Sequence, residues 1–179
     1  MAKSMITLSL AELEQQASRE DLLLRVQIRR PVNLWTFRLS VGKIVGPEKV
    51  QILGEMKAWA YNGINGLQLD TMQVRKNAPK GIGHLIWAST MAWAIQETNC
   101  RKARLLAIYD DHRQHEKLIK YFQRRGFTLV KNVGSAPLDL PLRLVWGGSG
   151  SLMAADCSEV YQKSYHLWDV TRRNKFNTF

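Results

Sequence analysis

The fold of this chain is decided by residues 67–83, which read LQLDTMQVRKNAPKGIG. Apolar and polar side chains alternate from Leu67 to Val74, which is typical of a half-buried strand. The turn at 80–83 follows, and apolar residues then recur at helical spacing from Ile82 to Thr98. A strand that passes through glycines into a helix presents free N–H groups at the positive end of the helix dipole. We therefore expect Gly81 and Gly83 to leave room there for a phosphate or diphosphate.

Further strands and helices are predicted on both sides of this segment. Alternating patterns predict antiparallel strands first, and a strand–helix–strand–helix unit follows, which implies an α+β sheet with one parallel pairing near its centre. Capping patterns also place a short helix or two before Leu22. The expected strands are Leu24–Ile28, Trp35–Val41, Val50–Tyr61, Leu67–Val74, Ala103–Tyr109, Phe127–Val133 and Leu142–Trp146, and the expected later helix is Arg113–Arg125, stopped by Gly126.

The last part of the chain has a different character. The stretch 147–150 is Gly-Gly-Ser-Gly, which predicts a flexible joint, and Asp156 and Glu159 form a helix-capping pattern after it. We therefore divide the chain into a domain at 1–146 and an extension at 147–179, made of a helix and a basic tail at 172–175. The apolar side of that helix fits packing back onto the core better than docking onto a partner.

Charge is the unusual feature of the composition. The 179 residues include 26 Lys and Arg against 15 Asp and Glu, for a net charge of +11. Such a surface favours anions such as a nucleotide cofactor, an acidic protein, nucleic acid or an anionic membrane, although a solvated helix face is an equal explanation for any single cluster. The longest apolar stretch, Leu85–Ile95, is too short to cross a bilayer. Two cysteines, Cys100 and Cys157, are too few for a metal site or a disulfide framework, so we expect a cytoplasmic protein.

Taken together, these stretches resemble the GNAT superfamily of acyl-CoA N-acyltransferases. The likeness runs from Leu22 to Trp146 and rests on the strand at 67–74, the turn at 80–83, the long helix after it and the Gly126-Phe127 pair. It implies a mixed, mainly antiparallel sheet flanked by helices, to which this chain adds a C-terminal helix. It also implies that acetyl-CoA or another acyl-CoA is the co-substrate. By resemblance, the residues that hold it are Met72, Val74, Lys80, Gly81, Ile82, Gly83 and His84.

The chain departs from the family at two positions. Ala78 stands where a Gln or Arg usually contacts the phosphates, so that Lys80, Arg75 or Lys76 would have to supply the charge. Phe122 stands where a Tyr often protonates the departing thiolate. Tyr121 is adjacent, but one residue turns a helical side chain by about 100°, so it is not a simple replacement. It remains a candidate acid.

Two carboxylates are candidates for the base that accepts the proton of the amine. Asp70 lies on the strand before the turn and Glu55 on the strand before that, although both also fit a purely structural role. The main hypothesis is an N-acetyltransferase that transfers the acyl group directly to an amine of a protein or small molecule. The alternative is a catalytically weak or inactive acyl-CoA-binding module that docks on an acidic partner. Nucleic-acid binding is a third reading that rests on charge alone.

Overall fold

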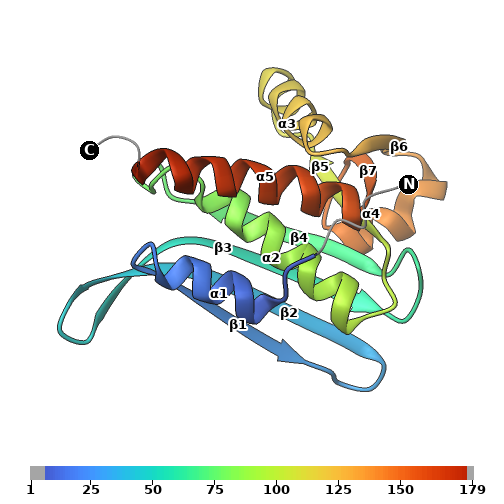
Figure 1. Ribbon diagram of the computed structural model, residues 1–179. Helices are drawn as coiled ribbons and strands as arrows, with labels where there is room; N and C mark the ends of the chain where they lie inside the picture. Colours follow the sequence, from blue (N-terminus) through green and yellow to red (C-terminus); the bar gives the residue numbers. More distant parts are fainter. Residues whose placement is uncertain (1–6, 177–179) are drawn as a thin grey trace, which may run out of the picture.

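The structure is a computed structural model that describes residues 7–176, which form seven strands and five α-helices. Figure 1 shows their arrangement. In order, the elements are α1 (Leu10–Ser18), β1 (Leu22–Arg29), β2 (Leu34–Gly46), β3 (Lys49–Tyr61), β4 (Leu67–Val74), α2 (Ile82–Glu97), β5 (Lys102–Ile108), α3 (His112–Arg124), β6 (Thr128–Val133), a 3₁₀ turn η1 (Pro137–Asp139), α4 (Leu140–Trp146), β7 (Gly150–Asp156) and α5 (Cys157–Phe176).

The seven strands form one sheet in the order β1-β2-β3-β4-β5-β7-β6. The pairing of β4 with β5 is parallel, and the other pairings are antiparallel. The expected fold class, a mixed and mainly antiparallel sheet flanked by helices with an added C-terminal helix, is therefore confirmed. The single parallel pairing lies at the centre of the sheet, where it was expected.

One predicted strand was wrong. Residues 142–146 belong to helix α4, and the last strand is β7 at Gly150–Asp156. Proline fits the first turn of a helix, and Pro141 stands there in α4. Gly147, in the left-handed conformation with φ +76°, ends the helix. A run of five residues was too short for its period to separate a strand from a helix.

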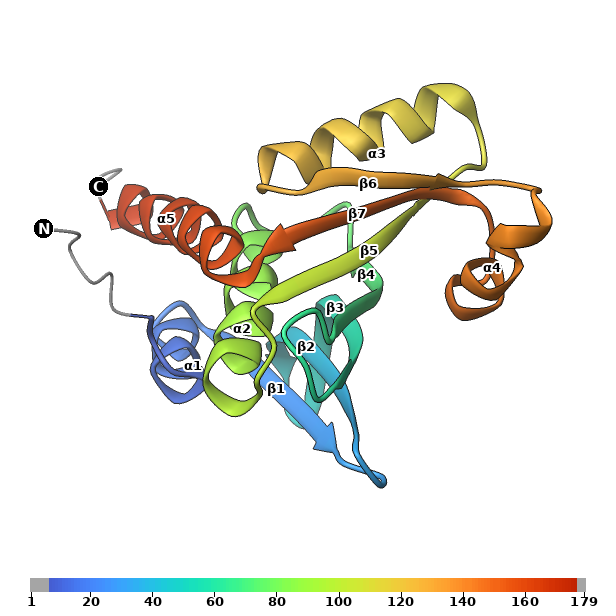
Figure 2. The same cartoon turned by 90° about the vertical axis from the view of Figure 1, so that its right-hand side faces the viewer.

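The helices gather on one face of the first part of the sheet. Figure 1 shows α1, α2 and α5 on the same side of β1, β2 and β3, and Figure 2 shows the same layering from a view turned by 90°. Side chains such as Phe37, Leu39 and Met56 point into this layer and are buried. Helix α2 is buried along most of its length, because the sheet covers one side and α1 and α5 cover the other.

The opposite face of these strands is polar. Within residues 7–176 no helix lies against it in Figure 1, and its side chains Arg25, Arg38, Lys57 and Asp70 are exposed. A groove of about 430 Å³ on this face is lined in part by Arg38, Lys57 and Asp70. We call this surface the open face.

Helix α5 packs back onto the core and does not project from it, as its apolar side predicted. Val160, Ser164 and Trp168 are buried in its contact with α2. The Tyr161 hydroxyl accepts a hydrogen bond from the Leu8 N–H at 2.8 Å, and the Trp168 indole donates to Gln16 Oε1 at 3.3 Å. The extension also provides β7, which lies between β5 and β6 in the sheet. The division of the chain into a domain at 1–146 and an extension at 147–179 stays a prediction.

The basic segment at 172–175 is part of α5 and not a tail beyond it. Arg172 donates to the Asp169 carboxylate at 2.7 Å, and Arg173 pairs with the same carboxylate at 2.8 Å. The expectation of a separate basic tail there was therefore wrong, because Asp169 binds the arginines three and four residues later within the helix.

Every helix in residues 7–176 is too short or too polar to cross a membrane.

Candidate functional site

Strands β4 and β5 separate at the centre of the sheet. They pair over only three residues, from Leu67 opposite Ala103 to Leu69 opposite Leu105. β4 continues to Val74 and β5 to Ile108, so the two strands diverge toward their carboxyl ends. In parallel strands these ends lie at the same edge, and in open sheets with helices a ligand commonly binds at such an edge.

The predicted glycine turn lies at this edge. Gly81 precedes the first turn of α2 in a left-handed conformation with φ +96°, and no side chain caps the helix there. Among the described residues, no hydrogen bond uses the N–H groups of residues 81–84. The first N–H groups of a helix have no partner within the helix, so these amides are available to an anion. Lys80, at the start of the turn, is exposed.

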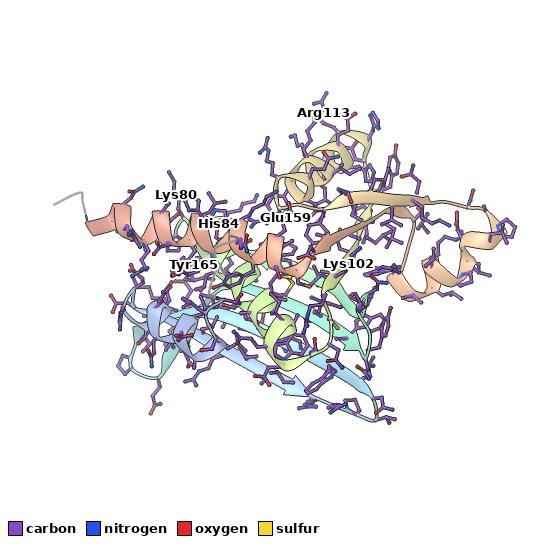
Figure 3. All side chains as sticks on the ribbon, turned by 45° about the vertical axis from the view of Figure 1, so that its right-hand side comes forward. Lys80, His84, Lys102, Arg113, Glu159 and Tyr165 are labelled. Atoms are coloured by element: carbon purple, nitrogen blue, oxygen red, sulfur yellow. The ribbon has the colours of Figure 1, made fainter. Side chains whose placement is uncertain are left out.

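Met72, Val74 and helix α5 surround the turn. A Cβ built on Gly83 would lie 3.6 Å from Met72 Cε and 3.7 Å from Val74 Cγ2, so the end of β4 lies directly beside this glycine. A Cβ built on Gly81 would approach Thr171 and Trp168 of α5 at 3.1 and 3.2 Å. Figure 3 shows Lys80 and His84 alongside α5. The structure therefore brings the seven residues predicted to hold the cofactor to one place, and α5 forms a wall of it. A groove of about 690 Å³ along β3 and the end of β4 is lined by Glu55 and Gln73 as well as by Met72 and Val74, and residues 80–84 are not part of its lining.

His84 and Arg125 meet next to this turn. Arg125 Nη2 lies 3.3 Å from His84 Nδ1, and because a guanidinium only donates hydrogen bonds, Nδ1 must accept. The His84 ring is therefore neutral and carries its proton on Nε2. Burial, and then the charge of Arg125, lower the pKa of His84 to about 4, which agrees with this state.

Tyr121 approaches the same place from α3. Its hydroxyl accepts a hydrogen bond from the Trp87 indole at 2.9 Å and lies 3.9 Å from Met72 Sδ. The neighbouring Phe122 packs instead against Trp87 and Phe127, with ring centroids 6.2 and 5.8 Å away. Of the two adjacent aromatic residues, Tyr121 is thus the one that directs a polar group to the end of β4.

The two candidate bases lie on the other side of the sheet. Asp70 is the extra residue of a bulge in β4, since Leu69 pairs with Ala58 and Thr71 with Lys57. A bulge redirects a side chain, and here it lies on the open face directly after the last pair between β4 and β5.

Glu55 is engaged by its neighbours. Its carboxylate accepts from Arg38 Nη2 at 3.0 Å and from the Ser40 hydroxyl at 3.2 Å. The hydrogen bond from Arg38 is the main cause that lowers the pKa of Glu55. A carboxylate whose pKa is lowered is a weaker base, so Glu55 is poorly suited to accept a proton.

The residues that sequence reasoning missed are those that tie the helices together at this site: Trp87, Arg125, Ser164 and Thr171. Arg125 stands in a run of basic residues, and nothing in the sequence indicates that it is buried.

Residues 7–176 contain no group of three or more His, Cys, Asp or Glu side chains that could hold a metal ion. Both cysteines are buried, and burial raises the pKa of Cys157 to about 12.

Comparison with known proteins gives only distant matches. No protein-family model and no curated protein matches the chain. Among solved structures, it is similar to an uncharacterized protein from Bacillus halodurans, with a TM-score of 0.48 and 14% identity over 78% of this chain and 66% of that one. It is also similar to a SpeG spermidine N-acetyltransferase chimera from Vibrio cholerae and hSSAT, with a TM-score of 0.48 and 12% identity over 89% of this chain and 84% of that one. An aminoglycoside 6'-acetyltransferase type Ii has a TM-score of 0.42 and 16% identity over 67% of this chain and 69% of that one. GNAT acetyltransferases, the superfamily that the sequence resembles, are thus among these neighbours. At such TM-scores and identities the matches do not indicate what this chain binds or does.

Proposed function

We propose that this protein is an acyl-CoA-dependent N-acyltransferase that uses acetyl-CoA and transfers its acyl group directly to an amine of a protein or small molecule. The observation that supports this best is the start of α2, where a glycine turn leaves the first-turn amides uncapped at the point where β4 and β5 diverge. Backbone amides at a helix N-terminus bind phosphate oxygens well. Among the residues expected to hold the cofactor, the uncapped amides of the turn and the exposed Lys80 suit the negative charge of a nucleotide diphosphate.

The acid of the proposed reaction is Tyr121. The thioester supplies an activated acyl group, and its transfer to nitrogen requires that the amine lose a proton and that the sulfur gain one. The Tyr121 hydroxyl already accepts a hydrogen bond from Trp87, and its own proton is directed toward a thioether, which is a weak acceptor. That proton is therefore available to a stronger acceptor such as a thiolate.

The base of the proposed reaction is Asp70. A lysine amine with an ordinary pKa near 10.4 costs about 4–5 kcal/mol to deprotonate at neutral pH, so a positioned carboxylate helps more than an acid at the sulfur does. Asp70 is exposed on the open face and next to the gap between β4 and β5. An amine would reach it from that face, while the nucleotide lies on the helix side.

Calorimetry and turnover test this proposal. We expect acetyl-CoA to bind at micromolar concentrations and an amine panel to contain at least one substrate. Asp70→Asn and Tyr121→Phe should each lower kcat by about 10²–10⁴-fold. Asp110→Asn and Tyr109→Phe, which change exposed residues of the same types, are the matched controls. Absence of acetyl-CoA binding at high micromolar concentration would contradict the proposal.

A second candidate function has three observations in its favour. Thr171 and Trp168 lie over Gly81, and Phe122 stands where the family often has its acid. The open face also carries more cations than carboxylates, and one of these carboxylates, Glu55, is paired with Arg38. These features suit an acyl-CoA-binding module with weak or no turnover that docks its basic face on an acidic protein.

A glutamate-rich peptide distinguishes the two functions. If the protein is such a module, we expect it to bind acetyl-CoA without turnover. We also expect it to bind the peptide, with an affinity that falls as salt is added and when Lys57 is changed to Gln. Lys49→Gln, which changes an exposed lysine at the far end of β3, serves as the control. Turnover that depends on Asp70 would exclude the module, and a salt-sensitive gel shift would point to nucleic acid instead.

A further inference from the structure

In the described part of the chain, Arg125 is a buried cation without a carboxylate partner. It ends helix α3, and only 7% of its surface is exposed. Nη1 donates to the Ser164 hydroxyl at 3.2 Å, and Nη2 donates to His84, while the buried Nε has no hydrogen-bond partner among the residues that the structure describes. No ion pair among residues 7–176 includes Arg125. The nearby carboxylate of Glu159 pairs with Lys163 at 2.7 Å.

Aromatic rings hold the guanidinium in place. Its central carbon lies 4.8 Å from the Tyr121 ring centroid and 5.3 Å from that of Trp87. Such cation–π contacts offset only part of the cost of burying a charge. Burial lowers the pKa of Arg125 from its usual value, but an arginine remains charged in proteins. The free protein thus keeps an incompletely compensated positive charge in its interior.

This charge points at the start of α2. A Cβ built on Gly83 would lie 4.0 Å from Arg125 Nη2. The N-terminus of a helix is itself positive, and the first turn of α2 contains no acidic residue. Two positive groups therefore face each other with no anion from the described part of the chain between them. His84 adds a further donor, the N–H at Nε2, next to them.

We propose that Arg125 binds a phosphate group of the nucleotide at the first turn of α2, and so supplies the side-chain contact that is missing at Ala78. This rests on the proposed function, in which that nucleotide is an acyl-CoA. The planar fork of an arginine matches two phosphate oxygens, and the uncapped amides contact the same group from the other side. Ser164 orients the guanidinium, which gives the C-terminal helix a role in binding.

Calorimetry of the full chain with inorganic pyrophosphate, acetyl-CoA and pantetheine tests this proposal. Pantetheine lacks the diphosphate, so it reports on the rest of the site. We expect Arg125→Met to weaken pyrophosphate and acetyl-CoA binding by about 10–100-fold and to leave pantetheine binding unchanged. Arg125→Lys keeps the positive charge and loses the planar fork, so its affinity for pyrophosphate and acetyl-CoA should lie between those of the unchanged protein and of Arg125→Met. Arg124→Met, at the exposed neighbour on α3, is the matched control and should change nothing.

The melting temperature separates a binding role from a structural one. Because Arg125→Met removes a poorly compensated buried charge, it should leave the melting temperature of the free protein unchanged or raise it. A large fall, with pyrophosphate binding intact, would mean that Arg125 only holds the helices together and would overturn the proposal. If the variant does not fold, the amide resonances of Gly81, Gly83 and His84 in the unchanged protein decide, since pyrophosphate should shift them. Amides that do not move would overturn the proposal.

The two proposals fail in different ways. In one outcome, acetyl-CoA binds, pyrophosphate does not compete with it, and Arg125→Met does not weaken its binding. This would overturn the role of Arg125 and leave the proposed function unaffected. Pyrophosphate binding that depends on Arg125, in a protein that does not bind acetyl-CoA, would support the phosphate site and remove the acyltransferase.

Discussion

Helices α2 and α3 begin at the same edge of the sheet, one after β4 and the other after β5, and their starts differ. At the start of α3, the Asp111 carboxylate accepts a hydrogen bond from the Arg113 N–H at 3.3 Å. At the start of α2, Gly81 holds the corresponding position and offers no side chain. Every helix start has N–H groups that lack partners within the helix. The chain satisfies one such group in α3, and it leaves the start of α2 open.

The two helices also differ in how firmly they are held. Eleven residues of α2 are buried, and none of α3 is. An open helix start can select a ligand only if its amides stay where they are, and burial keeps those of α2 in place. The comparison suggests that the less buried helix, α3, contributes individual side chains such as Tyr121 and Arg125 to a site whose frame is α2.

The largest effect is expected from loosening the frame. Trp168 is fully buried over the start of α2, so Trp168→Ala should lower the free energy of unfolding by about 3–5 kcal/mol. Urea denaturation measures this. Leu167→Ala, at a neighbour that is 45% exposed, is the control and should cost much less. Equal losses in the two variants would show that α5 is not a wall of the α2 start.

A methyl group at the open start should have the next largest effect. Gly81 has φ +96°, and a Cβ there would lie 3.1 Å from Thr171 Cγ2. Gly81→Ala should therefore destabilise the protein by about 1–3 kcal/mol through backbone strain and crowding. Gly148→Ala, at a glycine whose Cβ would meet nothing within 4 Å, should be neutral. A neutral result at both positions would remove the argument that only glycine fits at the start of α2.

Acid should weaken the α2 region through His84. Its pKa is about 4 in the folded protein, against about 6.5 when unfolded, so between these values the unfolded chain binds a proton that the folded one does not. Stability should fall as the pH drops from about 6.5 to 4, and this contribution should level off below that. Because the ring is only half-buried, we expect about 1–2 kcal/mol in total. His84→Gln should remove that part of the slope, whereas His112→Gln at the exposed start of α3 should retain it.

The smallest effect is expected at the start that the chain caps itself. Asp111→Ala should cost about 1 kcal/mol, and Asp111→Asn should restore most of it, because an amide oxygen also accepts from the helix N–H groups. Hydrogen exchange in α3 and urea denaturation measure this, with Asp110→Ala as the control. A loss as large for Asp110 would mean that charge near the helix, and not the cap, is what stabilises α3.

Local patterns predicted the frame of this site well. The alternation through Val74 and the glycines at 81 and 83 lie within one short segment, so the sequence contains both the strand and the helix start. The error at Leu142–Trp146 arose where a short apolar run fits two periods. Arg125 could not be found in this way, because its burial depends on Ser164, 39 residues later. Tyr121 could not be recognised either, because its position depends on how α3 packs on α2, where Phe122 lies against Trp87.

The position of β7 has a consequence for how the protein is made. Because β7 lies between β5 and β6, these two strands have no common neighbour until residue 156 has left the ribosome. Up to that moment the nascent chain carries unpaired strand edges, which invite misassembly. The last helix then covers α2 and brings Ser164 to Arg125. The contact between Ser164 and Arg125 thus forms only after α5 has been made.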